Sequence, residues 1–332
     1  MAIDVHAHVI VPELLRHDGA AESWRPQLRG RDGGTTVEID GRTISSFVHD
    51  PASIDCLLNS QRARGIEHTL VSPWVPLLFA EHEADVAAAR CDLQNEGLAR
   101  LRERAPEAVS VLGAVTLKDP VLGARELRAL MSSGFAGVEV PASVGGRYLG
   151  DPIFEPLWAA AEEEHALVFV HPTTRGFEDP VFAEHYLWNL VGNPVETTIA
   201  AAHLVMTGTV ERHPGMRILL AHGGGAILAL RGRLRHGQRA VKQAGARLAK
   251  PADQAIGSFL FDTVTHDPHV LRTLIEAVGR DQVLLGSDYP FDMGDPDPVG
   301  TVRAAGLGPD AECAILGGNA ERLLGLAARV AS

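Results

Sequence analysis

The sequence has few cysteines. Only Cys56, Cys91 and Cys313 occur among its 332 residues, and no two of them are close together in the chain. This spacing excludes a framework of disulfide bonds and a zinc site built from paired cysteines. We therefore predict a protein of a reducing compartment, the cytoplasm.

Long apolar runs and clusters of basic residues are also lacking. No apolar stretch approaches the roughly 20 residues that span a bilayer, and the N-terminal MAIDVHAHVI lacks the basic start of a signal peptide. The formal net charge is −12, and lysines and arginines form no long run. A nucleic-acid partner requires a basic surface, so we expect neither nucleic acid nor a membrane as a partner.

The sequence does contain a regular alternation of short apolar runs and longer helix-like segments. The apolar runs cover residues 2–10, 67–74, 108–115, 135–140, 166–171, 216–222, 258–264 and 282–288. Helix-like segments between them include 81–105, 119–132, 151–165 and 267–278. Strands that are apolar throughout and alternate with helices form parallel sheets, and eight of them close a barrel. We therefore predict one α/β domain over residues 1–332, a (β/α)₈ TIM barrel.

One segment, residues 11–50, interrupts this alternation. It contains the turn signals Gly33-Gly34 and Asp40-Gly41 between short runs that favour strands. We interpret it as a small β-rich insertion after the first strand, lying over the mouth of the barrel.

Potential ligand and acid/base side chains fall at the ends of four predicted strands. His6 and His8 lie in the first, His171 ends the fifth, His222 ends the sixth and Asp288 ends the eighth. Residues i and i+2 of a strand point to the same face, and the carboxyl ends of barrel strands meet at one mouth. We expect these five side chains to converge.

Imidazoles combined with a carboxylate suit one divalent metal ion, with Zn²⁺ favoured and Mn²⁺, Fe²⁺ or Co²⁺ as alternatives. Single residues also have purely structural uses: the glycines after His222 could serve only a tight turn, and Asp288 could cap the last helix. Asp4, two residues before His6, should lie deeper in the barrel, where it either orients one of the histidines or is a buried, hydrogen-bonded carboxylate. The shared position at strand ends favours a metal site.

Motifs spread over the whole chain resemble those of a known family. They are His6-Ala7-His8, FVHP (169–172), LAHGGG (220–225), LLGSDYPF (284–291) and GGNAERLLGL (317–326), with His49-Asp50-Pro51 before the first long helix. As a set they resemble the amidohydrolase superfamily (amidohydrolase-related family 2). The similarity is greatest to its branch around 2-amino-3-carboxymuconate-6-semialdehyde decarboxylase, with the γ-resorcylate and 5-carboxyvanillate decarboxylases.

This resemblance implies a role for each matching residue. His6, His8, His171 and Asp288 would bind a single metal ion, and His222 would be the acid/base, with Asp288 sharing in proton transfer. Arg233 would reach into the site of the neighbouring subunit and bind a substrate carboxylate, which implies a homodimer.

Two positions depart from the family pattern. The fourth strand reads AGVEV, without the lysine that bridges two metal ions in other amidohydrolases, although Glu139 could take a bridging role. Ser45 stands where the muconate-semialdehyde enzymes carry an arginine that binds a substrate carboxylate, and Arg42 would replace it only in a shifted loop. We expect Ser45 and Phe291 to contact the substrate.

An aromatic wall of the substrate pocket is a further expectation. Its candidates are Trp74, Phe177, His185, Trp188 and Phe291. Two more histidines, His49 and His266, fall in predicted mouth loops and could touch the substrate.

The leading hypothesis is a metal-dependent, non-oxidative decarboxylase of a small aromatic or unsaturated (muconate-semialdehyde-like) carboxylate, which uses metal-bound water and His222. The same site could instead hydrolyse a lactone, amide or imide, or hydrate a double bond. A barrel that only binds or scaffolds is the third hypothesis, and the full set of site groups argues against it.

Overall fold

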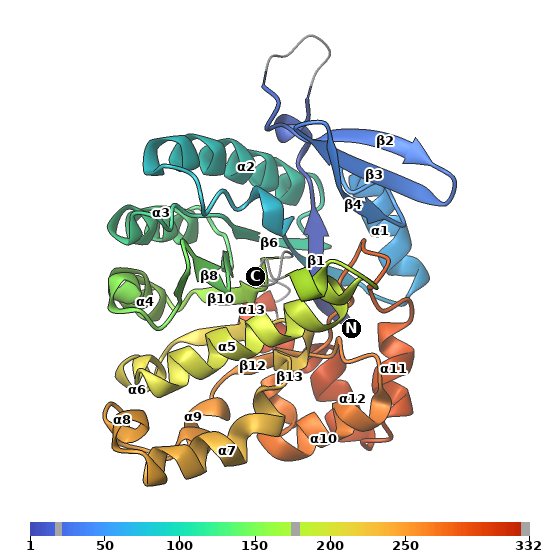
Figure 1. Cartoon of the computed structure of the whole chain (residues 1–332). Coiled ribbons are helices and arrows are strands. Elements are labelled where there is room, and N and C mark those ends of the chain that lie inside the picture. The colour runs from blue at the N-terminus through green and yellow to red at the C-terminus, as the bar shows by residue number, and fades with distance from the viewer. Residues whose placement is uncertain (17–21, 174–179, 327–332) are drawn as a thin grey trace.

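The barrel predicted from the alternation of runs is confirmed. The computed structural model describes residues 1–16, 22–173 and 180–326, and in it eight parallel strands form one nearly closed sheet (Figure 1). In spatial order they are β1 (Ile3–Val9), β5 (His68–Pro73), β6 (Val109–Gly113), β7 (Gly137–Pro141), β10 (Leu167–His171), β11 (Arg217–Leu220), β12 (Leu260–Asp262) and β13 (Val283–Leu284). Each of them overlaps one predicted apolar run.

The barrel closes between β1 and the segment that follows β13. Val5 donates its backbone N–H to Leu285 O (2.9 Å), Asp288 donates to His6 O (2.8 Å), and His8 donates to Tyr289 O (2.7 Å). These bonds hold Asp288 beside His6 although β13 has already ended at Leu284. The predicted eighth strand was therefore too long.

The sixth predicted strand was also longer than the observed one. β11 ends at Leu220, so His222 lies two residues beyond it. Both His222 and Asp288 have left-handed backbone conformations, with φ of 57° and 56°, which no strand residue adopts.

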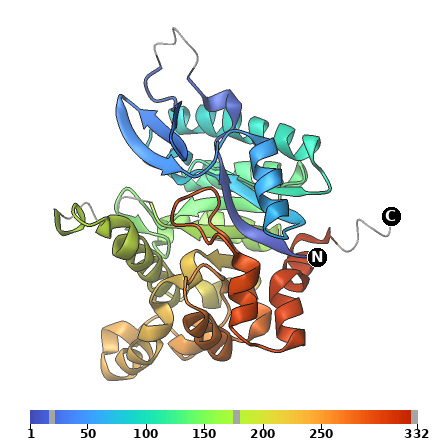
Figure 2. The same cartoon turned by 90° about the vertical axis from the view of Figure 1, so that its right-hand side faces the viewer.

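Helices surround the barrel on its outer side (Figures 1 and 2). The longer ones are α1 (Ile54–Ala63), α2 (Ala84–Arg104), α3 (Pro120–Ser132), α4 (Glu155–Glu163), α5 (Asn193–Met206), α7 (Ile227–Ala240) and α10 (Pro268–Val278). The shorter ones are α6 (Thr209–Arg212), α8 (Lys242–Gly245), α9 (Ala252–Ile256), α11 (Pro298–Ala304), α12 (Pro309–Cys313) and α13 (Asn319–Leu324). Asp119 and Asp267 accept backbone N–H groups at the starts of α3 and α10, where Pro occupies the first turn. Within the described residues, no helix is long and apolar enough to cross a membrane.

The barrel interior beneath the mouth is apolar. Val5, Leu70, Phe169 and Leu219 belong to one fully buried cluster inside the strands, and a larger cluster fills the space between strands and helices. Phe169 forms the floor of the mouth, because its ring centre lies 4.8 Å from that of His6.

The pairing of β1 with β5 shifts in register between Asp4 and Ala7. Val5 packs in the interior cluster and the His6 ring also meets Phe169, so the strict alternation of faces is broken here. Asp4 consequently faces α1, where it accepts a hydrogen bond from Gln61 Nε2 (2.7 Å). The expectation that Asp4 lies deeper in the barrel below His6 is wrong.

A three-stranded antiparallel sheet lies within residues 11–50, as predicted. Its strands are β2 (Gln27–Arg31), β3 (Gly34–Ile39) and β4 (Arg42–Phe47), at the upper right of Figure 1. A short hairpin of β8 (Ser143–Val144) and β9 (Arg147–Tyr148) follows β7. Phe47 bridges to Phe291, three residues after Asp288. That residues 11–50 form an insertion over the mouth of a single domain remains our proposal.

Candidate metal centre

Four of the predicted side chains converge at the carboxyl end of the barrel. His6 and His8 come from β1, His171 from the end of β10, and Asp288 from the segment after β13. One ligand atom from each lies within 4.8 Å of the others, and all four residues are buried. Asp288 Oδ1 is 3.3 Å from His6 Nε2 and 3.6 Å from His8 Nε2.

The hydrogen bonds of the histidine rings fix which nitrogen faces the centre of the cluster. His6 Nδ1 lies 2.6 Å from Asp262 Oδ2, and His8 Nδ1 lies 2.8 Å from Pro73 O. Both partners are acceptors, so each Nδ1 carries the hydrogen and each Nε2 presents a lone pair. The two Nε2 atoms are only 3.1 Å apart, close enough to share one hydrogen or to bind one metal ion together.

The other two members also present unused acceptor atoms. His171 Nδ1 bonds to Pro172 O (2.9 Å), while its Nε2 is buried without a hydrogen-bond partner. Asp288 Oδ1 is likewise buried and unpartnered. Buried polar atoms rarely remain unsatisfied, so three imidazole nitrogens and one carboxylate oxygen aimed at one point fit a divalent metal ion.

The pKa values of His6, His8 and Asp288 depend on one another. Burial disfavours a charged His6, but Asp288 and Asp262 outweigh it and raise the pKa of His6 to about 10. Burial and the neighbouring His6 lower the pKa of His8 to about 3. Burial alone would raise the pKa of Asp288, yet His6 and His222 hold it well below its usual range. Without a metal ion, a protonated His6 supplies the positive charge beside Asp288, and a divalent ion bound by the same atoms would supply it instead.

His222 lies at the open edge of this cluster. Its Nε2 is 3.5 Å from Asp288 Oδ2, and its ring centre is 5.1 Å from that of His171. Its side chain is 15% exposed, whereas those of His6 and His8 are fully buried. His222 is not one of the four clustered ligands and is therefore free to contact a substrate.

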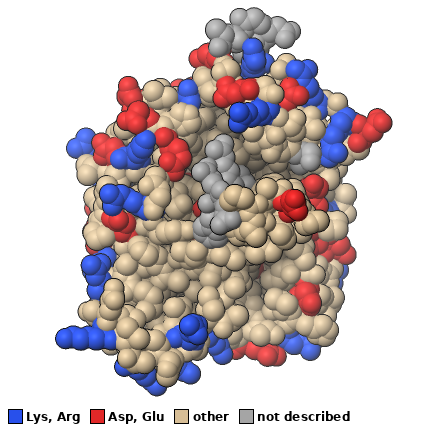
Figure 3. All heavy atoms as spheres, in the orientation of Figure 1, with Lys and Arg blue, Asp and Glu red and all other residues tan. Residues whose placement is uncertain are grey.

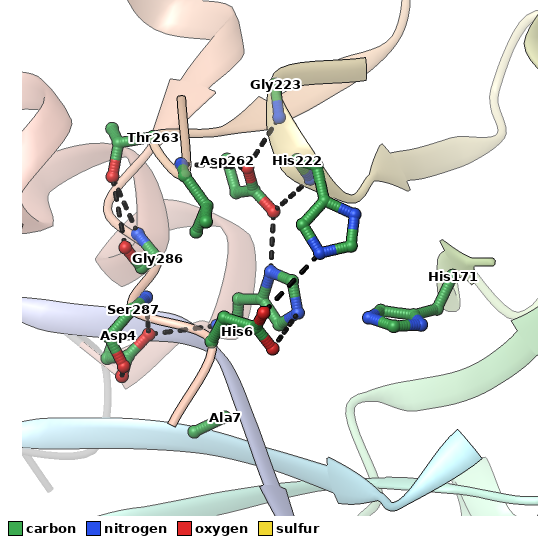
Figure 4. A network of polar contacts seen from close by, with 12 residues as sticks. Asp4, His6, Ala7, His171, His222, Gly223, Asp262, Thr263, Gly286 and Ser287 are labelled. Carbon is green, nitrogen blue, oxygen red and sulfur yellow. Dashed lines mark hydrogen bonds and ion pairs between the residues drawn. The ribbon is translucent and has the colours of Figure 1, made fainter. Parts of the chain in front are cut away.

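Asp262, the last residue of β12, is a site residue that the sequence interpretation missed. It is fully buried and contacts both His6 and the backbone of His222 (Figure 4). Burial opposes its charge, but the hydrogen bond from His6 lowers its pKa. The available signal was the run SFLFDTV (258–264), a seventh predicted strand with an acidic residue near its carboxyl end.

Asp4 contacts no imidazole ring. Its carboxylate accepts hydrogen bonds from the backbone of His6 and from Gln61, and from the backbone and hydroxyl of Ser287. Of the two interpretations of Asp4, the buried hydrogen-bonded carboxylate describes it.

Glu139 lies beside His8, with its Oε1 3.8 Å from His8 Nδ1. It is fully buried, and burial raises its pKa well above the usual range. The four-membered cluster does not include it, so the structure places no bridging carboxylate between two metal positions among the described residues.

Two cavities open from His222 and Asp288. The larger, of about 820 Å³, extends outward between α5, α7 and α10 and is lined largely by apolar side chains such as Leu228, Val270 and Leu274. The smaller, of about 20 Å³, is lined by Ser45 and Phe291 among others.

The remaining predicted residues are divided between these cavities and the surface. Trp74 and Trp188 line the smaller cavity, and His266 lines the larger one. His185 is exposed, 3.7 Å from Glu184, and His49 stacks on Tyr289 with ring centres 5.7 Å apart. Phe177 lies outside the described residues.

The two predicted arginines lie away from the cluster of their own chain. Arg42 on β4 and Arg233 on α7 are both exposed, and neither lines a cavity. Arg231, two residues before Arg233, lines the larger cavity instead. On the face shown in Figure 3, basic side chains are scattered among acidic ones and gather mainly at the lower edge, near α7 and α8.

Comparison with known proteins agrees with this geometry. The amidohydrolase family model matches residues 3–326. A 2-amino-3-carboxymuconate-6-semialdehyde decarboxylase of Dictyostelium discoideum is 30% identical and covers 98% of this chain and 92% of its own. A γ-resorcylate decarboxylase of Rhodococcus jostii is 28% identical over 72% of this chain and 77% of its own.

The chain therefore belongs to the amidohydrolase family. Within it, the chain falls in the branch of the 2-amino-3-carboxymuconate-6-semialdehyde decarboxylases, and it is a carboxy-lyase. Among solved structures, a dihydroxybenzoic acid decarboxylase from Polaromonas with bound manganese and the inhibitor 2-nitroresorcinol has a TM-score of 0.79 at 20% identity. That match covers 98% of this chain and 97% of the other and agrees with the barrel fold.

The cluster predicts how the protein responds to loss of metal. Chelation should remove a single divalent ion per chain and lower Tm, and Mn²⁺ or Zn²⁺ should restore it, because the ion binds only the folded state. His171→Ala should weaken binding at least about tenfold by removing one ligand. Elemental analysis and thermal melts measure both effects.

His213→Ala is the matched control for that variant. His213 is another mostly buried histidine, bonded to Glu155 and Glu162 and remote from the cluster, so its loss should leave the metal content unchanged. Equal metal content in the His171 and His213 variants would contradict the assignment of His171.

Proposed function

We propose that this protein catalyses metal-dependent, non-oxidative decarboxylation of a small aromatic or unsaturated carboxylate. The observation that carries the proposal is His222, an imidazole held beside the buried ligand cluster but outside it, facing a mostly apolar cavity. The similar proteins named as 2-amino-3-carboxymuconate-6-semialdehyde, γ-resorcylate and dihydroxybenzoic acid decarboxylases support it.

His6, His8, His171 and Asp288 would hold the metal ion. When bound, the ion supplies Lewis-acid chemistry that orients the substrate carboxylate and stabilises negative charge. We propose Zn²⁺ from the nitrogen-rich ligand set, with Mn²⁺ as the alternative that the manganese-bound relative supports.

His222 would deliver the proton to the carbon that loses CO₂. Its Nε2 faces Asp288 Oδ2 at 3.5 Å, so the carboxylate can stabilise the charged form of the ring before transfer. His222 is also exposed to the cavity, where the substrate carbon can come within reach.

The smaller cavity suggests what kind of substrate fits. Its walls include Trp74, Trp188 and Phe291, and Ser45 occupies the position of the arginine that related enzymes use. Among the described residues, no lysine or arginine lines it. The larger cavity has room for a ring, whereas the smaller one holds little more than a water molecule. We propose that a planar substrate without a second carboxylate occupies the larger cavity and turns one edge toward Ser45 and Phe291.

We also propose the homodimer in which Arg233 serves the neighbouring site. The guanidinium is exposed on α7, a helix whose only buried residue is Ile227. No hydrogen bond or ion pair joins Arg233 to the described residues of its own chain.

The free state of Cys56, Cys91 and Cys313 is consistent with the proposed cytoplasmic location.

The first test is a screen of ortho-hydroxy and ortho-amino carboxylates with the metal-loaded protein. Decarboxylation predicts release of one CO₂ per product molecule, measured directly as evolved gas and as the matching loss of mass from the substrate. Conversion of a lactone, amide or imide by ring opening, without CO₂, would instead establish hydrolysis at the same residues. Addition of water to a double bond would establish hydration.

The second test addresses His222. His222→Asn should keep a full complement of metal, because His222 lies outside the ligand cluster, while the rate should fall by about 10²–10⁴ with loss of the acid/base. Metal analysis and steady-state kinetics measure the two effects. A near-normal rate would show that another group transfers the proton.

The third test addresses the homodimer. If Arg233 and His222 of one site come from different subunits, co-expressed Arg233→Ala and His222→Asn chains form mixed dimers with one intact site each. Random pairing then predicts about a quarter of wild-type activity from two nearly inactive variants. Failure of such mixtures to regain activity would reject the shared site.

A further inference from the structure

Asp262 uses every acceptor position of its carboxylate at the junction of three strands. Oδ2 accepts from His6 Nδ1 (2.6 Å) and from the backbone N–H of His222 (2.9 Å). Oδ1 accepts from the backbone N–H groups of Gly223 (2.7 Å) and Val264 (3.0 Å). One side chain of β12 therefore joins a residue of β1 to the loop after β11 (Figure 4).

The bond to His6 decides how that ring can bind metal. A carboxylate only accepts hydrogen bonds, so His6 must keep its hydrogen on Nδ1 and leave the Nε2 lone pair for the ion. The bond also fixes the orientation of the His6 ring, because the ring is fully buried and Asp262 holds its Nδ1.

The bonds to His222 and Gly223 hold an otherwise unfavourable loop. Four successive residues, 222–225, have positive φ values of 57°, 59°, 74° and 61°, and the first of them carries a side chain. The three glycines adopt positive φ readily, but His222 has a Cβ, and its conformation persists only where the surroundings impose it. The far end is fixed by α5, because Ala226 N donates to Thr198 Oγ1 (2.8 Å) and Gly225 has no room for a Cβ against Pro194 O.

We infer that Asp262 is a positioning residue that couples metal binding at His6 to the alignment of His222, through one carboxylate. The His222 half of this inference rests on the proposed function, whereas the His6 half depends only on the metal centre. Asp262 is neither a member of the four-residue cluster nor one of the residues that line the two cavities, and it acts through these two histidines.

Asp262→Asn is a discriminating substitution because the amide cannot satisfy both sides. If its oxygen takes the place of Oδ2, the NH₂ group faces the N–H groups of Gly223 and Val264. If its oxygen takes the place of Oδ1, the NH₂ group faces the N–H of His222 and forces His6 to move its hydrogen to Nε2. Either arrangement disturbs the loop or removes the lone pair that binds metal.

Asp4→Asn is the matched control. Asp4 is also fully buried and also accepts four hydrogen bonds, two on each oxygen, beside the same strand β1. None of its donors is an imidazole. It therefore reports what the loss of a buried carboxylate network does where the only links to the ligand cluster are to the backbone of His6 and to Ser287 beside Asp288.

The experiment compares wild type, Asp262→Asn and Asp4→Asn by three measurements. Mn²⁺ affinity is read from the electron paramagnetic resonance signal of the free ion, backbone mobility from hydrogen–deuterium exchange of peptides covering 220–226, and kcat at saturating Mn²⁺. Thermal melts check that both variants fold.

We expect Asp262→Asn to bind Mn²⁺ about 10–100-fold more weakly, to exchange faster at 220–226, and to keep a kcat defect of at least about tenfold at saturating metal. Asp4→Asn should lower Tm and weaken Mn²⁺ binding less than Asp262→Asn does, with unchanged exchange at 220–226, because it leaves the contacts of Asp262 with the His6 ring and the loop in place.

Unchanged Mn²⁺ affinity in Asp262→Asn would overturn the His6 half of the inference. Weaker affinity with normal exchange and normal kcat at saturating metal would overturn the coupling to His222. If no carboxylate is turned over by wild type, the proposed function fails, while Mn²⁺ affinity and exchange still decide the role of Asp262.

Discussion

The site depends on the closure of the barrel between β1 and the segment after β13. The backbone bonds from Asp288 to His6 and from His8 to Tyr289 align these two stretches side by side. Because the contacts are between backbone atoms, they place the carboxylate of Asp288 beside both histidines of β1 regardless of metal. His171 then needs only to end the facing strand β10 at the same level, and the four ligand atoms meet.

Buried carboxylates around β1 show how surroundings decide the use of one chemical group. Asp262 and Asp4 each receive four hydrogen bonds, but the first receives one from an imidazole and the second only from backbone, amide and hydroxyl groups. Glu139 lies 3.8 Å from His8 Nδ1, and its burial favours the neutral form of the carboxyl group. The same group thus orients a histidine at Asp262, joins backbone segments at Asp4 and stays uncharged at Glu139.

The sequence predicted the barrel, a β-rich insertion and the convergence of His6, His8, His171 and Asp288, because each depends on a local and regular pattern. His6 and His171 could be placed because strand periodicity and strand ends are visible in the apolar runs. Asp4 could not, because the register shift before Ala7 has no signal in the apolar pattern and reverses the face of the strand. Asp262 was visible at a strand end, but its function depends on contacts with two segments distant in sequence.

The backbone conformation at His222 and Asp288 could not be predicted from the sequence either. His222 and Asp288 were expected to end strands, whereas both lie past them in left-handed conformations set by tertiary hydrogen bonds. Loop residues 222–225 have a visible glycine signal, yet only the fold shows that Pro194 and Thr198 close around them.

The bridge between Phe47 and Phe291 has a consequence for how this scaffold can diversify. All four ligand residues belong to the barrel or its closing segment, while part of the pocket wall belongs to the sheet of residues 27–47. Changes in that sheet can therefore reshape this wall without touching those four residues. Phe291 is the exception, because it follows Asp288 by three residues and packs on both Phe47 and the His8 ring. A smaller side chain at Phe291 would therefore loosen the wall and the ligand cluster together.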